Sequence, residues 1–148
     1  MNTEYKQSFN YGTPGMPWGG TGTAFPVIDT RAVEGDNMHF GIAVVVGSRP
    51  GKTVKVGEGT FEGISVNTWV IEKDYRGQGV TVHETDPISV MKIGRVWVAL
   101  KEGATPKYGD PVHIVDDGLL SNQGGTLIQN ARFITENIGS DCAAIELR

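Results

Sequence analysis

Glycine is the feature of this sequence that most constrains its fold. Of the 148 residues, 21 are glycine, about twice the usual share of roughly 7%. They recur every several residues along the chain. A glycine inside a helix costs about 1 kcal/mol relative to alanine, whereas tight turns accept glycine without steric cost. The spacing therefore disfavours long helices and predicts an all-β fold of short strands joined by tight turns.

Length and cysteine content indicate one self-sufficient domain. A chain of about 150 residues buries roughly two thirds of its unfolded surface on folding, which is enough for one core. The single cysteine, Cys142, cannot form an intramolecular disulfide, as is typical of proteins made in a reducing cytoplasm. Its apolar neighbours predict a buried thiol and not a reactive one. We therefore expect a single compact β-barrel or β-sandwich.

Charge and hydropathy exclude two classes of partner. The net charge is −4 and no stretch gathers the lysines and arginines that a phosphate-binding surface needs. Residues Met1–Lys6 lack the apolar core of a signal peptide, and the apolar run Ile42–Val46 is far shorter than a membrane span. We expect neither a nucleic-acid partner nor a membrane partner.

The first quarter of the chain differs from the rest, and we expect residues 1–36 to form an extended arm and residues 37–148 to form the β domain. Glycines and prolines follow one another too closely in the arm for a regular element. The arm also carries the aromatic residues Tyr5, Phe9, Tyr11, Trp18 and Phe25. Solvated linkers are poor in aromatics, and large rings gain free energy mainly by burial. We expect these five to form a protein interface, either on their own domain or, as we favour, on a neighbouring subunit.

Alternating apolar residues predict the strands of the body. In residues 38–46, Met38, Phe40 and Ile42 fall on the same side as Val44 and Val46, as in a strand that packs on a core. Further predicted strands are a short one through Val54 and Val56, then 61–66, 69–72, 88–91, 95–100, 111–115 and 142–147.

Residues 126–138 fit two interpretations. Leu127, Ala131, Ile134 and Ile138 have helical spacing in a stretch without glycine or proline. The order of segments described below favours a strand over Arg132–Thr135 instead. Helix and strand both remain open here.

The segment Val44–Thr53 superficially resembles a phosphate-binding loop. That loop has four residues between its glycines, so that successive N–H groups surround the phosphates. Here Gly47 and Gly51 enclose three residues, and one of them, Pro50, has no N–H to donate. We instead expect a type II turn over Arg49–Lys52, with glycine at the position of positive φ.

No catalytic, cofactor or metal site is predicted. Gly63–Asn67 resembles a hydrolase nucleophile elbow only up to its fifth position, where asparagine replaces glycine. His39, His83 and His113 are far apart in sequence, and no two have the spacing of metal ligands. No pair of carboxylates is marked as a general acid and base. We expect a protein that is not an enzyme.

Taken in order, a series of short motifs resembles the cement, or head decoration, proteins of tailed bacteriophages. The motifs are Pro14-Gly15-Met16, Asp29–Gly35, Phe40–Val44, Phe61–Val66, Gly94–Val98, Tyr108–Val112, Gly118–Ser121 and Ala131-Arg132-Phe133. Each motif is short and centred on glycine or an aromatic residue, so the specificity of the resemblance lies in their order over most of the chain.

The resemblance implies a structural protein of the virion, made in the host cytoplasm. Such a protein binds the outer surface of the capsid between neighbouring major capsid proteins and stabilises the shell. It also implies a homo-oligomer, a trimer or alternatively a dimer. A different hypothesis is a glycan- or host-binding β-sandwich of a virion, for which Trp69 and Trp97 would be the candidate platform residues.

Overall fold

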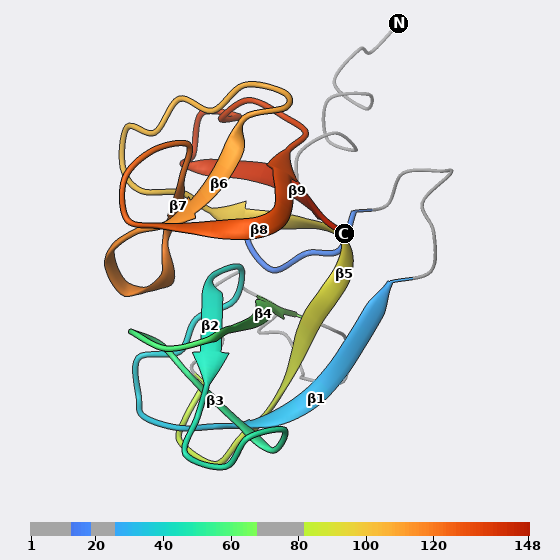
Figure 1. Ribbon diagram of the computed structural model, residues 1–148, viewed down its shortest axis with the longest axis vertical. Coiled ribbons are helices and arrows are strands. Elements are labelled where there is room, and N and C mark those ends of the chain that lie inside the picture. Colours follow the sequence, from blue (N-terminus) through green and yellow to red (C-terminus); the bar gives the residue numbers. More distant parts are fainter. Residues whose placement is uncertain (1–12, 19–25, 68–81) are drawn as a thin grey trace, which may run out of the picture.

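The computed structural model describes residues 13–18, 26–67 and 82–148, and this part of the chain is all-β (Figure 1). The strands in chain order are β1 (Val27–Val33), β2 (Ala43–Val46), β3 (Thr53–Lys55), β4 (Phe61–Val66), β5 (Pro87–Ala99), β6 (Pro111–Ile114), β7 (Leu120–Ser121), β8 (Thr126–Phe133) and β9 (Cys142–Leu147). A single 3-10 turn, Asp116–Gly118, is the one helical element in the described residues. The predicted all-β class is confirmed.

Five strands close a barrel in the order β1-β3-β2-β4-β5, because β1 also pairs with β5. All pairings in this barrel are antiparallel except the parallel pair β1 and β3. One buried cluster of this barrel joins side chains of β1, β2, β3 and β5, including Val33, Val44, Val54, Ile88 and Val90. The predicted barrel is therefore present, and β-branched residues fill it as expected for strands that face a core.

The remaining strands form a second lobe in the order β5-β9-β8-β6-β7, and Figure 1 shows it lying against the barrel. A parallel bridge between Leu100 and Leu120 brings the chain after β5 alongside β7 and nearly closes this lobe. Its core holds Phe133, Leu120 and Ile145, all fully buried.

Strand β5 belongs to both lobes. Its first half pairs with β1 and β4, and its second half, from Gly94 to Ala99, pairs with β9. The change of partner falls at Gly94, whose φ of +135° only glycine adopts readily. We predicted separate strands at 88–91 and 95–100. This was wrong, because Gly94 redirects a continuous strand and does not end it.

Two other predicted strands have different bounds. Of residues 38–46, only Ala43–Val46 is a strand. Gly41 has a φ of +79°, which breaks the extended backbone, although Met38 and Ile42 are still buried. Residues 126–133 form strand β8, so the helical interpretation is wrong and the strand starts earlier than Arg132.

The strand predicted through Val54 and Val56 is β3, which ends at Lys55, and the strand predicted at 111–115 is β6, which ends at Ile114. The predicted turn at Arg49–Lys52 is confirmed. The N–H of Lys52 donates to the carbonyl of Arg49 at 2.9 Å, and Gly51 has a φ of +79°, as a type II turn requires. The last strand has the predicted bounds 142–147. The strand predicted at 69–72 lies outside the described residues. Within the range 1–36, Val27–Val33 are part of the barrel as β1.

Candidate protein-interaction surface

Residues 13–18 lie along β5 as a short segment that begins with a turn at Pro14-Gly15 and pairs with β5 at Pro17. The N–H of Gly15 donates to the carbonyl of Trp97 at 2.8 Å, and the N–H of Trp97 donates to the carbonyl of Met16 at 2.9 Å. The N–H of Trp18 donates to the carbonyl of Arg95 at 2.9 Å. Since these bonds use the second half of β5, the segment occupies the side of that strand opposite β9.

A close contact between two glycines fixes this segment at the junction of the lobes. A Cβ at Gly41 would lie 2.5 Å from the N atom of Gly15, and a Cβ at Gly15 would lie 2.5 Å from that of Phe40. Both distances are below any real Cβ contact, so only glycine fits at either position. The carbonyl of Gly15 also accepts from the N–H of Asn67, just after β4. The segment therefore contacts both lobes.

Trp18 packs on its own domain. Its ring stacks on Trp97, and a small apolar cluster of Cys142, Ala144, Ile134 and Ile138 completes the site. Trp97 is 5% exposed, so the indole is covered, whereas Trp18 is half-buried. Of the five predicted interface residues, Trp18 thus makes an intramolecular contact. Tyr5, Phe9, Tyr11 and Phe25 lie outside the described residues.

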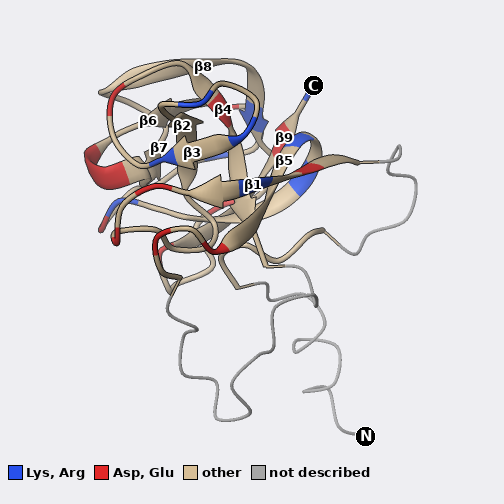
Figure 2. Cartoon of the chain, turned by 90° about the horizontal axis from the view of Figure 1, so that it is seen from below, with Lys and Arg blue, Asp and Glu red and all other residues tan. Residues whose placement is uncertain are grey.

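A row of charged side chains crosses the same sheet beside this cluster. Arg95 on β5 pairs in register with Glu146 on β9, and Glu146 pairs with Arg132 on β8. The Arg95 Nε atom is 3.0 Å from Glu146 Oε2, and the Nε atoms of Arg132 and Arg148 are 3.5 and 3.6 Å from Oε1. We call Arg95, Arg132 and Arg148 with Glu146 the arginine row. Figure 2 shows basic and acidic bands together on β5 and β9 near the C-terminus.

Tyr108 extends the arginine row toward solvent. The Arg132 guanidinium carbon lies 5.2 Å from the centroid of the Tyr108 ring, and Tyr108 is 66% exposed. This is a cation–π contact at the surface. We did not predict the row, because its members are far apart in sequence and meet only through strand pairing. A sequence signal existed in the alternation of Arg95 and Trp97, and of Ala144 and Glu146, which places each pair on one face.

The comparison with known families decides the class of protein. A family model described as "Structural cement protein (E217 gp24/Pam3 gp6)" matches residues 1–148, the whole chain. This chain belongs to the structural cement protein family. The resemblance found in the sequence is confirmed, and the role of the chain is structural, in a bacteriophage capsid.

A solved structure supports the fold of this cement protein. A chain from "The capsid of Myoviridae Phage XM1" superimposes with a TM-score of 0.67 at 15% sequence identity. The match covers 92% of this chain and 89% of that chain. At this identity the likeness concerns the fold. No curated protein matches the sequence.

The motifs that resemble enzyme sites have structural roles in this cement protein. Ser65 is fully buried, and its hydroxyl donates to the carbonyl of His39 at 2.6 Å. In the loop that resembles a phosphate site, the Glu34 carboxylate accepts from the Ser48 N–H and hydroxyl and from the Thr53 hydroxyl. Glu34 thus uses the donors that a phosphate would need, and these bonds, from Ser48 first, lower the pKa of its carboxyl.

A second charged cluster lies on the barrel and is balanced. Lys92 contacts Glu62 at 2.9 Å and Asp29 at 3.2 Å, and Arg31 contacts the same two carboxylates at 3.2 and 3.3 Å. The hydrogen bond from Lys92 lowers the pKa of Asp29, and the bond to Glu62 raises the pKa of Lys92. Two cations and two anions balance one another, so this cluster joins β1, β4 and β5 and carries no net charge.

A groove of about 1420 Å³ lies on loops of both lobes. Its lining includes six glycines and the side chains of Glu58, Glu102, Asp116 and Asp117, with Lys101 as the one cation. Lys101 and Asp116 form an exposed ion pair at 3.4 Å. These groups are solvent-exposed surface charges, and their arrangement does not mark a nucleophile with its base.

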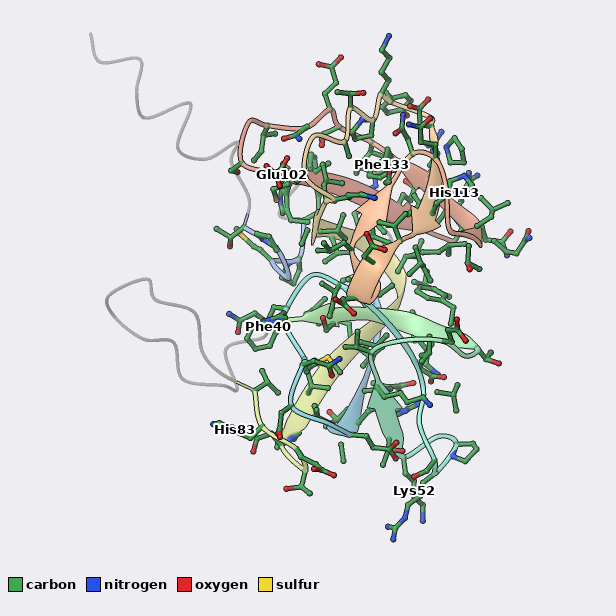
Figure 3. All side chains as sticks on the ribbon, turned by 90° about the vertical axis from the view of Figure 1, so that its left-hand side faces the viewer. Phe40, Lys52, His83, Glu102, His113 and Phe133 are labelled. Carbon is green, nitrogen blue, oxygen red and sulfur yellow. The ribbon has the colours of Figure 1, made fainter. Side chains whose placement is uncertain are left out.

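The described residues show no group placed to hold a metal ion, no membrane-spanning helix and no exposed ring at Trp97 for a sugar. Residues 13–18, 26–67 and 82–148 contain no group of three or more His, Cys, Asp or Glu side chains placed to hold a metal ion. Figure 3 shows His83 and His113 on different lobes. In the same ranges no helix is long and apolar enough to cross a membrane. Trp97 offers no exposed ring for a sugar, and Trp69 lies outside these ranges.

Proposed function

We propose that this protein binds the outer surface of a phage head between neighbouring major capsid proteins and stabilises the shell, as a homotrimer or alternatively a homodimer. Membership of the cement family along the whole chain carries this proposal. The fold adds a mechanism. The two lobes share β5, and residues 13–18 contact both of them, so the body can hold two capsid subunits at a fixed spacing.

The arm supplies the second contact in this proposal. Residues 13–18 are anchored to β5, and Thr13 is exposed. Tyr5, Phe9 and Tyr11 precede that anchor in the sequence. Aromatic side chains dominate the binding energy of many protein interfaces. We propose that these three bury their rings on a neighbouring subunit, while Trp18 holds the arm in place.

A capsid-binding assay tests the proposal. Purified protein added to expanded capsids that lack it should co-sediment with them and raise their melting temperature. Each contact is repeated many times over a shell, so weak individual interfaces sum to a measurable effect. If the protein neither co-sediments nor changes the melting temperature, the proposed function is wrong.

Two truncations separate the arm from the body. Deletion of residues 1–12 keeps the anchored segment and should leave the unfolding temperature of the free protein unchanged while it weakens capsid binding. Deletion of residues 1–25 also removes Gly15 and Trp18, and should destabilise the fold. Full capsid binding by the shorter deletion would show that Tyr5, Phe9 and Tyr11 have no role at the interface.

A further inference from the structure

The arginine row differs from the other charged cluster in its balance of charge. Its side chains carry three positive charges against one carboxylate, whereas the barrel cluster has two of each sign. A terminal carboxylate on Arg148 would reduce the excess to one positive charge. The chain as a whole carries −4. The row is therefore a local cationic surface on an acidic protein, with hydrogen-bonding capacity that Glu146 alone does not use.

The row is also held in a fixed geometry. The Glu146 side chain is only 13% exposed, and it lies between Arg95 and Arg132, each 32% exposed, on three adjacent strands. The Tyr108 ring also contacts the Arg132 guanidinium. A guanidinium presents several N–H donors in a planar fork, which matches the two oxygens of a carboxylate. Because β-strands position these forks before any partner arrives, little side-chain entropy is lost on binding.

The row adjoins the anchored arm. Arg95 and Trp97 are two residues apart on β5, so the arginine row and the stacked indoles share one face of the β5, β9 and β8 sheet. The Arg95 carbonyl also accepts the hydrogen bond from the Trp18 N–H. Arginine, tyrosine and tryptophan are the residue types enriched at the energetic centres of protein interfaces. Their combination with an unbalanced charge indicates a surface for a protein partner.

We propose that the arginine row binds an acidic, carboxylate-bearing segment of the major capsid protein. This inference rests on the proposed function and specifies which face of the body meets the capsid and with what chemistry. A partner carboxylate would pair with the guanidinium groups that Glu146 only partly satisfies. Charge complementarity of this kind also sets orientation and accelerates association.

A nucleic acid fits the row less well. Affinity for nucleic acid grows with the number of phosphates that lysines and arginines neutralise. Here three arginines surround a carboxylate on a protein that is acidic overall, so a polyphosphate chain would be repelled beyond the row. A short acidic peptide segment can bind through the local excess of positive charge in the row alone.

The test uses a triple variant, R95Q/R132Q/E146Q, which removes the two guanidinium forks on the strands together with the carboxylate between them and keeps Arg148. It loses two positive charges and one negative charge, so its net charge falls by one. The matched control is K52Q, which also lowers the net charge by one. Figure 3 shows Lys52 at the opposite end of the molecule from the lobe that holds Phe133. Unfolding temperatures establish that both variants fold.

We expect the triple variant to bind expanded capsids at least about ten-fold more weakly than the native protein, with a smaller dependence on salt. K52Q should bind as the native protein does. A poly-glutamate peptide should compete with capsids for the native protein and not for the triple variant. If the triple variant does not fold, R95K/R132K replaces it, because it keeps the charges and loses the forks. This variant should bind capsids more weakly than the native protein, by less than the roughly ten-fold loss expected for the triple variant.

Three outcomes would overturn the inference. In the first outcome, a folded row variant keeps the capsid affinity and salt dependence of the native protein, while deletion of residues 1–12 weakens binding. This would show that the row does not bind the capsid and would leave the proposed function intact. The second outcome concerns duplex DNA. If the native protein binds duplex DNA, and the row variant loses that binding but keeps its capsid affinity, the row would be assigned to nucleic acid. If the native protein itself does not bind capsids, the proposed function fails and the inference fails with it.

Discussion

The Trp18 ring stacks on the Trp97 ring, with centroids 5.3 Å apart and planes inclined by 29°. The two residues are far apart in sequence, and the contact joins the N-terminal arm to the strand that the two lobes share. The backbone bonds of residues 13–18 to β5 hold the arm in the same place. The folded body therefore includes this anchored segment, which lies before β1 in the sequence. Single substitutions can remove the contact between the two rings.

Trp18→Ala should uncover Trp97 without unfolding the protein. The loss of a stacked, half-buried indole should lower the free energy of unfolding by about 1–3 kcal/mol. In a Trp69→Phe background, where Trp97 is the one tryptophan left, its fluorescence should shift to longer wavelength, and chemical denaturation should give the change in stability. Trp18→Phe retains an aromatic ring and serves as the matched control. An Ala variant with native stability and spectrum would show that the stack is not formed in solution.

Gly63→Ala should destabilise the junction between β4 and β5. A Cβ at Gly63 would lie 2.4 Å from the carbonyl oxygen of Met91 and 2.6 Å from a side-chain carbon of Val90. Backbone must therefore move, and we expect a loss of about 2–3 kcal/mol in denaturant unfolding. Gly103→Ala is the control, since nothing lies within 4 Å of its Cβ position. It should cost about 1 kcal/mol, for its positive φ alone. Equal effects at the two sites would contradict the packing described here.

Glu34 should lower the free energy of unfolding as the pH becomes acidic. Hydrogen bonds from Ser48 and Thr53 hold the pKa of its carboxyl below the ordinary value of 4.5 in the folded protein. Folding therefore favours the ionised form, and this contribution is full above pH 4.5 and is lost as the pH falls through the lower, folded pKa. Glu34→Gln should narrow the stability difference between pH 6 and pH 3, followed by thermal unfolding at each pH. An unchanged pH profile would mean that Glu34 is not ionised in this loop.

Cys142 should be unreactive in the folded protein. Its side chain is fully buried at the start of β9, and burial raises the pKa of the thiol to about 11. Since the thiolate is the reactive form, few molecules react at pH 8 without opening. Alkylation by iodoacetamide, followed by mass spectrometry, should be slow for the native protein and fast in denaturant. Rapid labelling of the folded protein would show that β9 opens readily.

Local sequence determined the class of fold and several of its elements. Glycine spacing and two-residue alternation predicted an all-β chain, and the strands 61–66 and 142–147 have their predicted bounds. The turn at Arg49–Lys52 also follows from local chemistry, because Pro50 and Gly51 favour its two central conformations. These features depend on neighbours in the sequence, so the sequence suffices for them.

Tertiary structure decided which partner each strand and side chain meets. The alternation of Met38, Phe40 and Ile42 reports burial correctly, yet it cannot show that Gly41 leaves the strand to contact Gly15. Gly94 looks like the end of a strand until both lobes are present to pair with β5. Arg95, Glu146 and Arg132 form a row only because β9 lies between β5 and β8. Periodicity in a sequence shows that a face is covered, whereas long-range pairing determines what covers it.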